Sequence, residues 1–160
     1  MKIFPTKELA FRLNGEQSET LNRLKRRTEH SEELKSKFTD KSFIGKINGN
    51  DFKIISSAFG KGALSVMSGK IDSNKGQVNV KIHIIFKIIF SFFIIIPLIG
   101  FIVMILSETE KFSPIMILVL VGQILIVRYI FIGYAFKRFS KESLNRLRDV
   151  LDIEWIKKAE

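Results

Sequence analysis

The sequence predicts an α+β membrane protein. Its expected parts are a small N-terminal antiparallel β-meander domain with one helix, a two-helix transmembrane hairpin and a C-terminal amphipathic helix. Two observations carry this prediction: residues 88–106 contain no charged side chain, and several segments before residue 84 alternate apolar with polar side chains. Alternation is typical of a strand, whereas a long uncharged run is typical of a membrane span. The expected boundaries are 1–83, 84–136 and 137–160.

The two apolar segments of the hairpin are long enough to cross a bilayer. The first has 19 uncharged residues, and about 20 apolar residues cross a hydrocarbon core of roughly 30 Å. The second is expected to begin near Pro114, because Ser113 followed by a proline matches a capped helix start. With so short a turn between them, the spans, about 85–106 and 114–136, are expected to be antiparallel neighbours. Pro97 and Gly100 indicate a packing kink in the first span.

Basic residues are distributed unevenly around the hairpin. Residues 1–87 carry 17 Lys and Arg against 9 Asp and Glu, residues 107–113 carry 1 against 2, and residues 137–160 carry 7 against 5. Segments rich in Lys and Arg stay in the cytoplasm, so both termini are expected to be cytoplasmic. The bias toward Lys, Ile, Phe and Ser suits an AT-rich bacterial genome, and the cell (inner) membrane is the expected location. The N-terminus lacks an early apolar core, which predicts no signal peptide.

The segment before the hairpin predicts one strand and one helix, followed by further strands. Residues 7–13 alternate and end at an Asn-Gly pair, which indicates a strand. Residues 18–29 open with Ser18 as a capping residue and end with basic residues, the polarity that a helix dipole favours. Only Leu21 and Leu24 are apolar in that helix. We therefore expect one narrow stripe of the helix to pack.

The strongest local signal is a β-hairpin over residues 43–56. Its turn, residues 48–51, is rich in Asn and Gly, which tolerate positive φ. Two more strands are expected at 63–71 and 77–84. The result is a four-stranded antiparallel meander, in an α+β sheet or a small curled barrel.

The last of these strands runs directly into the first span. Val78, Val80, Ile82 and Ile84 alternate with polar residues, and no Gly-Ser or Pro-rich linker follows them. A flexible tether would need such a linker. We therefore expect the domain to lie close to the bilayer in a restricted orientation.

A last helix is expected from Ser140 to about Trp155. Apolar side chains recur on one side of it, at Leu144, Leu147, Val150, Leu151 and Trp155. This face has two possible roles. It covers the meander and completes the soluble domain, or it lies in the membrane interface with the tryptophan as an anchor.

Few residues carry the chemistry of an active site. His30 and His83 are far apart and have no neighbouring carboxylate pattern, so each is interpreted as structural or solvated. Residues 59–62 (FGKG) lack the spacing of a phosphate-binding loop and are interpreted as a turn. The chain has no cysteine, and no metal-ligand spacing is present. We expect no enzymatic activity, no metal and no cofactor.

Basic side chains are candidates for contact with lipid or with a partner. Lys25, Arg26 and Arg27 form a cluster on the predicted helix. The cluster is either a solvated face or a docking surface for lipid phosphates or an acidic partner. The net charge of +10 suits an anionic inner leaflet, and nucleic acid is not expected to be a ligand.

Further polar residues lie in or beside the predicted spans. Lys87, Lys137 and Arg138 are expected to contact lipid headgroups at the cytoplasmic boundary. Arg128 lies inside the second span, about two turns from its cytoplasmic end, and is expected to extend its side chain to the headgroups. Gln123 is the other intramembrane polar residue and is a candidate for a hydrogen bond across a helix interface.

Three hypotheses from different classes follow. The favoured one is a membrane-anchored binding or scaffolding module for a protein or lipid-headgroup partner. The alternative is an oligomerising membrane effector or small channel gated by the cytosolic domain. The third, an enzyme acting on lipid headgroups, is disfavoured because no catalytic constellation is found. The expected partners are the lipid bilayer, a cytosolic protein and further copies of the chain.

Overall fold

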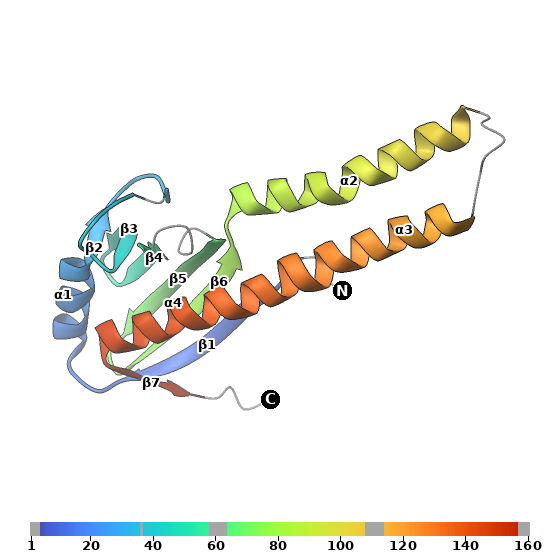
Figure 1. Cartoon of the computed structure of the whole chain (residues 1–160). Helices are drawn as coiled ribbons and strands as arrows, with labels where there is room; N and C mark the ends of the chain where they lie inside the picture. The colour runs from blue at the N-terminus through green and yellow to red at the C-terminus, as the bar shows by residue number, and fades with distance from the viewer. Residues whose placement is uncertain (1–3, 36, 58–63, 108–113, 157–160) are drawn as a thin grey trace.

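The computed structural model describes residues 4–35, 37–57, 64–107 and 114–156. The architecture is α+β, with a mixed sheet and two long apolar helices (Figure 1). The elements in chain order are β1 (Thr6–Leu13), α1 (Gln17–Arg27), β2 (Thr28–His30), β3 (Phe43–Asn48), β4 (Asp51–Ser56), β5 (Ser65–Asp72), β6 (Lys75–Ile82), α2 (Ile84–Leu106), α3 (Pro114–Leu125), the π-helix η2 (Ile126–Tyr134), α4 (Ala135–Leu151) and β7 (Ile153–Ile156).

The sheet contains the predicted meander. Strands β3 to β6 pair antiparallel in sequence order, and the seven-stranded sheet has the order β2-β3-β4-β5-β6-β1-β7. Strand β1 pairs antiparallel with β6, so the first strand of the chain lies beside the last strand of the meander. Strands β2 and β7 form the two edges, so the sheet is open and the alternative of a curled barrel is wrong.

The turn between β3 and β4 forms as its sequence predicts. Asn48 pairs with Asp51, and Gly49 between them has a φ of 57°. A left-handed φ carries no steric cost for glycine. This local chemistry sets the register of the whole β3–β4 ladder.

The N-terminal helix differs from its prediction at both ends. Glu16 is the N-cap and makes no side-chain capping hydrogen bond, so the expected capping by Ser18 is wrong. The helix ends at Arg27, and residues 28–30 form β2, which lies parallel to β3. A three-residue strand has no periodicity to detect in the sequence. It forms because the edge of β3 offers backbone partners.

The C-terminal helix ends earlier than predicted. The Asp152 N–H makes the last helical hydrogen bond, to the Arg148 carbonyl at 2.8 Å, and the φ of 53° at Asp152 then ends α4 at Leu151. The next residues form β7 along β1, where Trp155 packs edge-on against Phe11 with ring centroids 6.0 Å apart. Trp155 is therefore part of the sheet and is not on the helix face proposed as a membrane anchor.

One continuous helix replaces the predicted second span and separate C-terminal helix. It runs over 37 residues from Ile115 to Leu151, a length of roughly 55 Å. The expected separate start of the last helix at Ser140 is not found, because α4 continues η2 directly. Buried side chains are five residues apart in η2, at Val127 and Ile132, and then four apart to Phe136. The π-helical segment thus keeps one buried stripe in phase along both halves.

Helices α1 and α4 cover one face of the sheet. Leu24 of α1 and Leu144, Leu147 and Leu151 of α4 are buried there. The Ser143 and Ser65 hydroxyls are 3.0 Å apart, which joins α4 to β5. Of the two roles left open for the apolar face of the last helix, covering the meander is the one found.

The hairpin joins the sheet without a linker, as predicted. Strand β6 ends at Ile82, His83 caps the next helix, and α2 begins at Ile84. The hydrophobic core continues into the base of the hairpin through Phe90, Val127, Ile132 and Phe136. The domain and the hairpin base therefore share one core.

Helix α2 and the helix from Ile115 to Leu151 are each long and apolar enough to cross a membrane. Only 6% and 11% of their most apolar windows are buried, which distinguishes them from core helices of a soluble protein. The expected start of the first span, near residue 85, agrees with α2, and the second helix begins at Pro114 as predicted. The expected cap at Ser113 lies outside the described residues.

Candidate functional site

A hollow lined by residues of α1 and α4 contains several basic side chains. Its volume is about 800 Å³. We define the basic cleft by its lining residues: Arg23, Arg26, Arg27, Asp40, Lys41, Ser42, Arg146, Asp149 and Val150. Five of these side chains are cationic and two are anionic, so the cleft favours an anionic ligand.

The packing of the two helices produces this arrangement. In α1, Thr20 and Leu24 are buried against the domain, which leaves the arginines on the outer side. In α4, Leu144 and Leu147 are buried, which places Arg146 at the margin of the helix contact. Helices far apart in the sequence thereby bring their guanidinium groups around one hollow.

Two of the cations already have anionic partners. The Arg23 guanidinium donates to the Glu19 carboxylate at 2.7 Å and lies 3.7 Å from the Asp152 carboxylate. The hydrogen bond to Glu19 raises the pKa of Arg23. Lys41 lies 3.3 Å from the Glu29 carboxylate and donates to the Thr28 carbonyl at 3.3 Å. These two residues shape the cleft and are partly neutralised.

Three arginines of the cleft are unpaired. Arg26, Arg27 and Arg146 make no ion pair with any residue that the structure describes. A guanidinium binds carboxylate or phosphate through two parallel N–H donors. Three such groups around one hollow can therefore bind several carboxylates, or a phosphate, at once.

The sequence identified part of this cleft. Arg26 and Arg27 line it as members of the predicted basic cluster, whereas Lys25 is exposed on α1 and does not line it. Arg146 and Lys41 were missed, because they come from segments that the sequence does not connect with α1. Helix α1 lies at the end of the sheet domain away from the hairpin (Figure 1). The cleft is therefore remote from the apolar helices.

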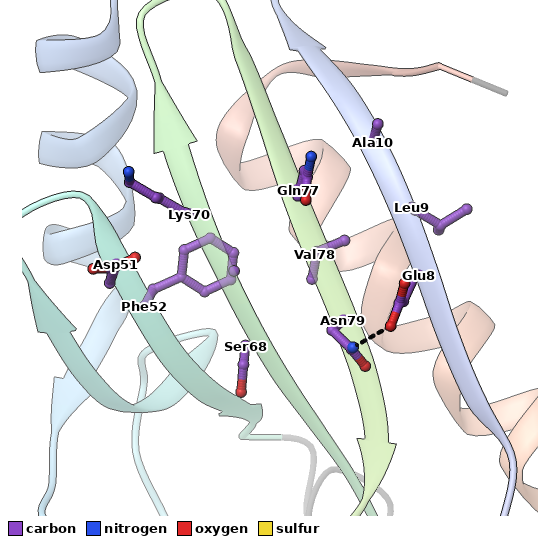
Figure 2. Close-up of a pocket in the computed structure, with 11 residues that line it drawn as sticks. Glu8, Leu9, Ala10, Asp51, Phe52, Ser68, Lys70, Gln77, Val78 and Asn79 are labelled. Atoms are coloured by element: carbon purple, nitrogen blue, oxygen red, sulfur yellow. Dashed lines mark hydrogen bonds between the residues drawn. The ribbon is translucent and has the colours of Figure 1, made fainter. Parts of the chain in front are cut away.

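A second hollow, of about 480 Å³, lies on the polar face of the sheet (Figure 2). Its polar lining residues are Glu8, Asp51, Ser68, Lys70, Gln77 and Asn79. The Asn79 amide donates to the Glu8 carboxylate at 2.8 Å, the dashed line in Figure 2. The Asn79 carbonyl oxygen is buried and accepts no hydrogen bond within the described chain. This hollow offers hydrogen bonds but has mixed charge, so the basic cleft is the stronger candidate.

The other predicted contact residues lie on the two long helices. Lys87 in α2 is 5.9 Å from the centroid of the Phe4 ring, and Arg128 in η2 is 5.9 Å from that of Tyr129. Lys137 and Arg138 are exposed in the first turn of α4. These four cations are at or near the base of the hairpin, so the structure separates them from the cluster on α1.

The histidines have structural surroundings. His83 is the N-cap of α2, where its Nδ1 accepts a hydrogen bond from the Ile85 N–H at 3.3 Å. Burial lowers the pKa of His83. His30 is exposed in β2, with its Nε2 4.0 Å from a Glu32 carboxylate oxygen. Residues 59–62 lie outside the described part of the chain, and within that part no group of three His, Cys, Asp or Glu side chains could bind a metal.

Comparisons with known proteins leave the geometry as the basis for any functional argument. No family model matches the chain, and neither a curated protein nor a solved structure matches it.

Proposed function

We propose that the chain is a two-span membrane protein whose sheet domain binds an acidic segment of a cytosolic protein in the basic cleft. The observation that carries the proposal is the set of unpaired arginines, Arg26, Arg27 and Arg146, around one hollow. A merely solvated surface would not require arginines from two helices to lie around the same hollow.

The apolar helices support the membrane part of the proposal. Large apolar side chains are exposed around α2 and α3, including Ile99 at 54% and Leu118 at 72%. A helix that is apolar on all sides is stable in water only when it is buried. Hydrocarbon is the solvent that suits these surfaces. The excess of basic residues before and after the hairpin supports a cell (inner) membrane location with both termini cytoplasmic.

The position of the cleft favours a protein over a lipid headgroup. Arg146 lies eleven residues beyond the start of α4 at Ala135, roughly 16 Å along the helix axis. Helix α1 is at the far end of the domain from the hairpin (Figure 1). With the hairpin in the bilayer, the cleft faces the cytosol. Carboxylates of a protein segment can reach it there, whereas headgroups lie near the hairpin base.

The binding test uses the full-length protein in nanodiscs of zwitterionic lipid, so that the bilayer itself contributes no anionic charge. The probe is a fluorescein-labelled peptide of alternating Glu and Gly, followed by fluorescence anisotropy. Arg26→Gln with Arg146→Gln should weaken binding by about tenfold or more, because charge-assisted hydrogen bonds to carboxylates contribute roughly 1.5–3 kcal/mol each. Binding should also weaken as salt increases.

Lys25→Gln is the matched control for this experiment. It removes one positive charge from α1, as Arg26→Gln alone does, but outside the cleft. An equal loss in the control and the cleft variant would overturn the proposed site, and so would an absence of binding at low salt. Tighter binding to nanodiscs or vesicles that contain anionic lipid than to the peptide would assign the cleft to a lipid.

The membrane placement has its own test. The protein should stay in the membrane fraction after an alkaline carbonate wash, and tags at both termini should be protected from protease in intact cells. Recovery in the aqueous fraction, or a terminal tag that is accessible from outside, would contradict the placement.

A further inference from the structure

A crevice between the two long helices contains a polar side chain. Its volume is about 310 Å³. We define the hairpin crevice by its lining residues: Pro97, Gly100, Phe101, Met104, Met116, Val119, Leu120 and Gln123. All of these except Gln123 are apolar or glycine, so one amide faces an otherwise apolar groove.

Gln123 is exposed and makes no hydrogen bond with any described residue. In water such an amide would be solvated. In hydrocarbon, an amide without a hydrogen-bond partner is strongly unfavourable, because no water is present to take the partner's place. The proposed function places the hairpin in the bilayer. There, the Gln123 amide has no hydrogen-bond partner among the described residues of its own chain.

A second group without its helical partner lies on α2, one turn before the crevice residue Pro97. Pro97 has no amide hydrogen, so the Phe93 carbonyl one turn earlier lacks its helical donor. Pro97 lies nine residues before the end of α2 at Leu106, and Gln123 lies nine residues after the start of α3 at Pro114. Each is therefore roughly 14 Å from the hairpin turn. Pro97 and Gln123 therefore line the crevice at one depth, and the Phe93 carbonyl lies about one helical turn farther from the hairpin turn.

A second copy of the chain has the matching group, its own Gln123. A two-fold axis along the membrane normal places identical residues at identical depth. A carboxamide has both donors and an acceptor, so it pairs with another carboxamide. A Cβ added at Gly100 would meet nothing within 4 Å, so the crevice is open to close approach. We infer that the hairpin crevice is the interface of a homodimer in which the Gln123 amides of two copies hydrogen-bond to each other.

The chain has no cysteine, which permits a direct crosslinking test. Val119→Cys places a thiol in the crevice, and Val121→Cys places one outside it. Both valines are exposed, at 61% and 48%, and they point about 160° apart around the helix. Copper-phenanthroline oxidation in native membranes should give at least about tenfold more disulfide-linked dimer at position 119. Equal crosslinking at both positions, or none at either because lipid fills the crevice, would overturn the inference.

A second experiment measures association by energy transfer between labelled copies in lipid vesicles. Gln123→Leu should weaken the dimer by roughly 3- to 20-fold, the range for interhelical hydrogen bonds in membranes. Gln123→Asn should retain much of the association, because the amide remains. Association that is unchanged in Gln123→Leu would overturn the role of the amide.

Gly100→Leu and Gly122→Leu form a matched pair. At either position the added Cβ meets nothing within 4 Å. Only Gly100 lines the crevice, so only Gly100→Leu should prevent dimerisation. The inference rests on the membrane placement proposed above, and the two fail differently. A protein absent from the membrane fraction contradicts the placement, whereas a membrane-bound protein without these pair differences contradicts only the dimer.

Discussion

The helix from Ile115 to Leu151 has two halves with opposite surfaces. In the α3 half, Leu118 and Val119 are 72% and 61% exposed although they are apolar. In the α4 half, Leu144 and Leu147 are 3% and 0% exposed, and the charged residues lie on the outer side. The backbone is continuous through both. The side-chain pattern therefore follows the surroundings of each half, which are the sheet for α4 and, in our proposal, lipid for α3.

The comparison teaches where substitutions should be tolerated. Apolar side chains of α4 are packed against a sheet, so their removal leaves a cavity. Apolar side chains of α3 mostly face outward, so lipid or detergent can fill the space that they vacate. The following predictions test this difference, from the largest expected effect to the smallest.

Leu147→Ala should destabilise the protein by about 2–5 kcal/mol, because a fully buried leucine would leave a cavity between α4 and the sheet. Leu118→Ala, the same change in the exposed half, should change stability by less than about 1 kcal/mol. The measurement is denaturant unfolding in mild detergent, followed by the fluorescence of Trp155. This is the single tryptophan, and it lies in the sheet. Equal losses at the two positions would show that the exposed half is packed against something else.

Glycine substitutions test the same contrast by adding volume. The Cβ of Gly76→Ala would collide with the buried Phe11 ring and lie 2.8 Å from the Lys70 carbonyl oxygen. Overpacking of this kind should cost about 1–3 kcal/mol in the same unfolding assay. Gly122→Ala in α3 meets nothing within 4 Å and should leave the stability of the sheet domain unchanged. If Gly76→Ala were also neutral, the contact between β1 and β6 would be looser than the structure shows.

The smallest effect concerns pH at the junction between the two regions. Burial lowers the pKa of His83, the nearby Lys53 lowers it further, and a hydrogen bond with the Leu34 backbone acts in the opposite direction. The unfolded chain therefore binds the proton more readily. Stability should fall as the pH drops below the unfolded pKa of about 6.5, and the loss should level off below the folded pKa.

His83→Asn is the control for that pH dependence. Asparagine is a good N-cap residue and can accept the Ile85 N–H, but it does not titrate. The variant should unfold with a flatter stability profile between pH 7.5 and 5.5 than the unmodified chain. Identical profiles for the two proteins would assign the acid sensitivity to other groups.

Local patterns in the sequence predicted much of the fold and part of the candidate site. Alternation located β1 and the four strands of the meander, and the uncharged runs located α2 and α3. Arg26 and Arg27 were recognisable as a basic cluster, and Gln123 as a polar exception in an apolar run. Each of these features is carried by residues that are close together in the chain, which is why the sequence alone reveals it.

Features that depend on distant partners could not be found in this way. Strand β2 forms beside β3, and β7 forms beside β1, which begins almost 150 residues earlier in the chain. Arg146 joins the basic cleft only because α4 packs against α1 on the same face of the sheet. Continuity between the second span and α4 was also missed, since the change from apolar to charged side chains resembled a boundary.

The sequence by itself determined which segments are apolar on all sides and which alternate, because side-chain solvation is a property of each residue and its near neighbours. Only the tertiary structure decided that one helix serves both the hairpin and the sheet, and that arginines from α1 and α4 meet in one cleft. The physical reason is that strand pairing and helix packing are interactions between two segments. Their free energy depends on both partners, so the sequence of one segment does not reveal it.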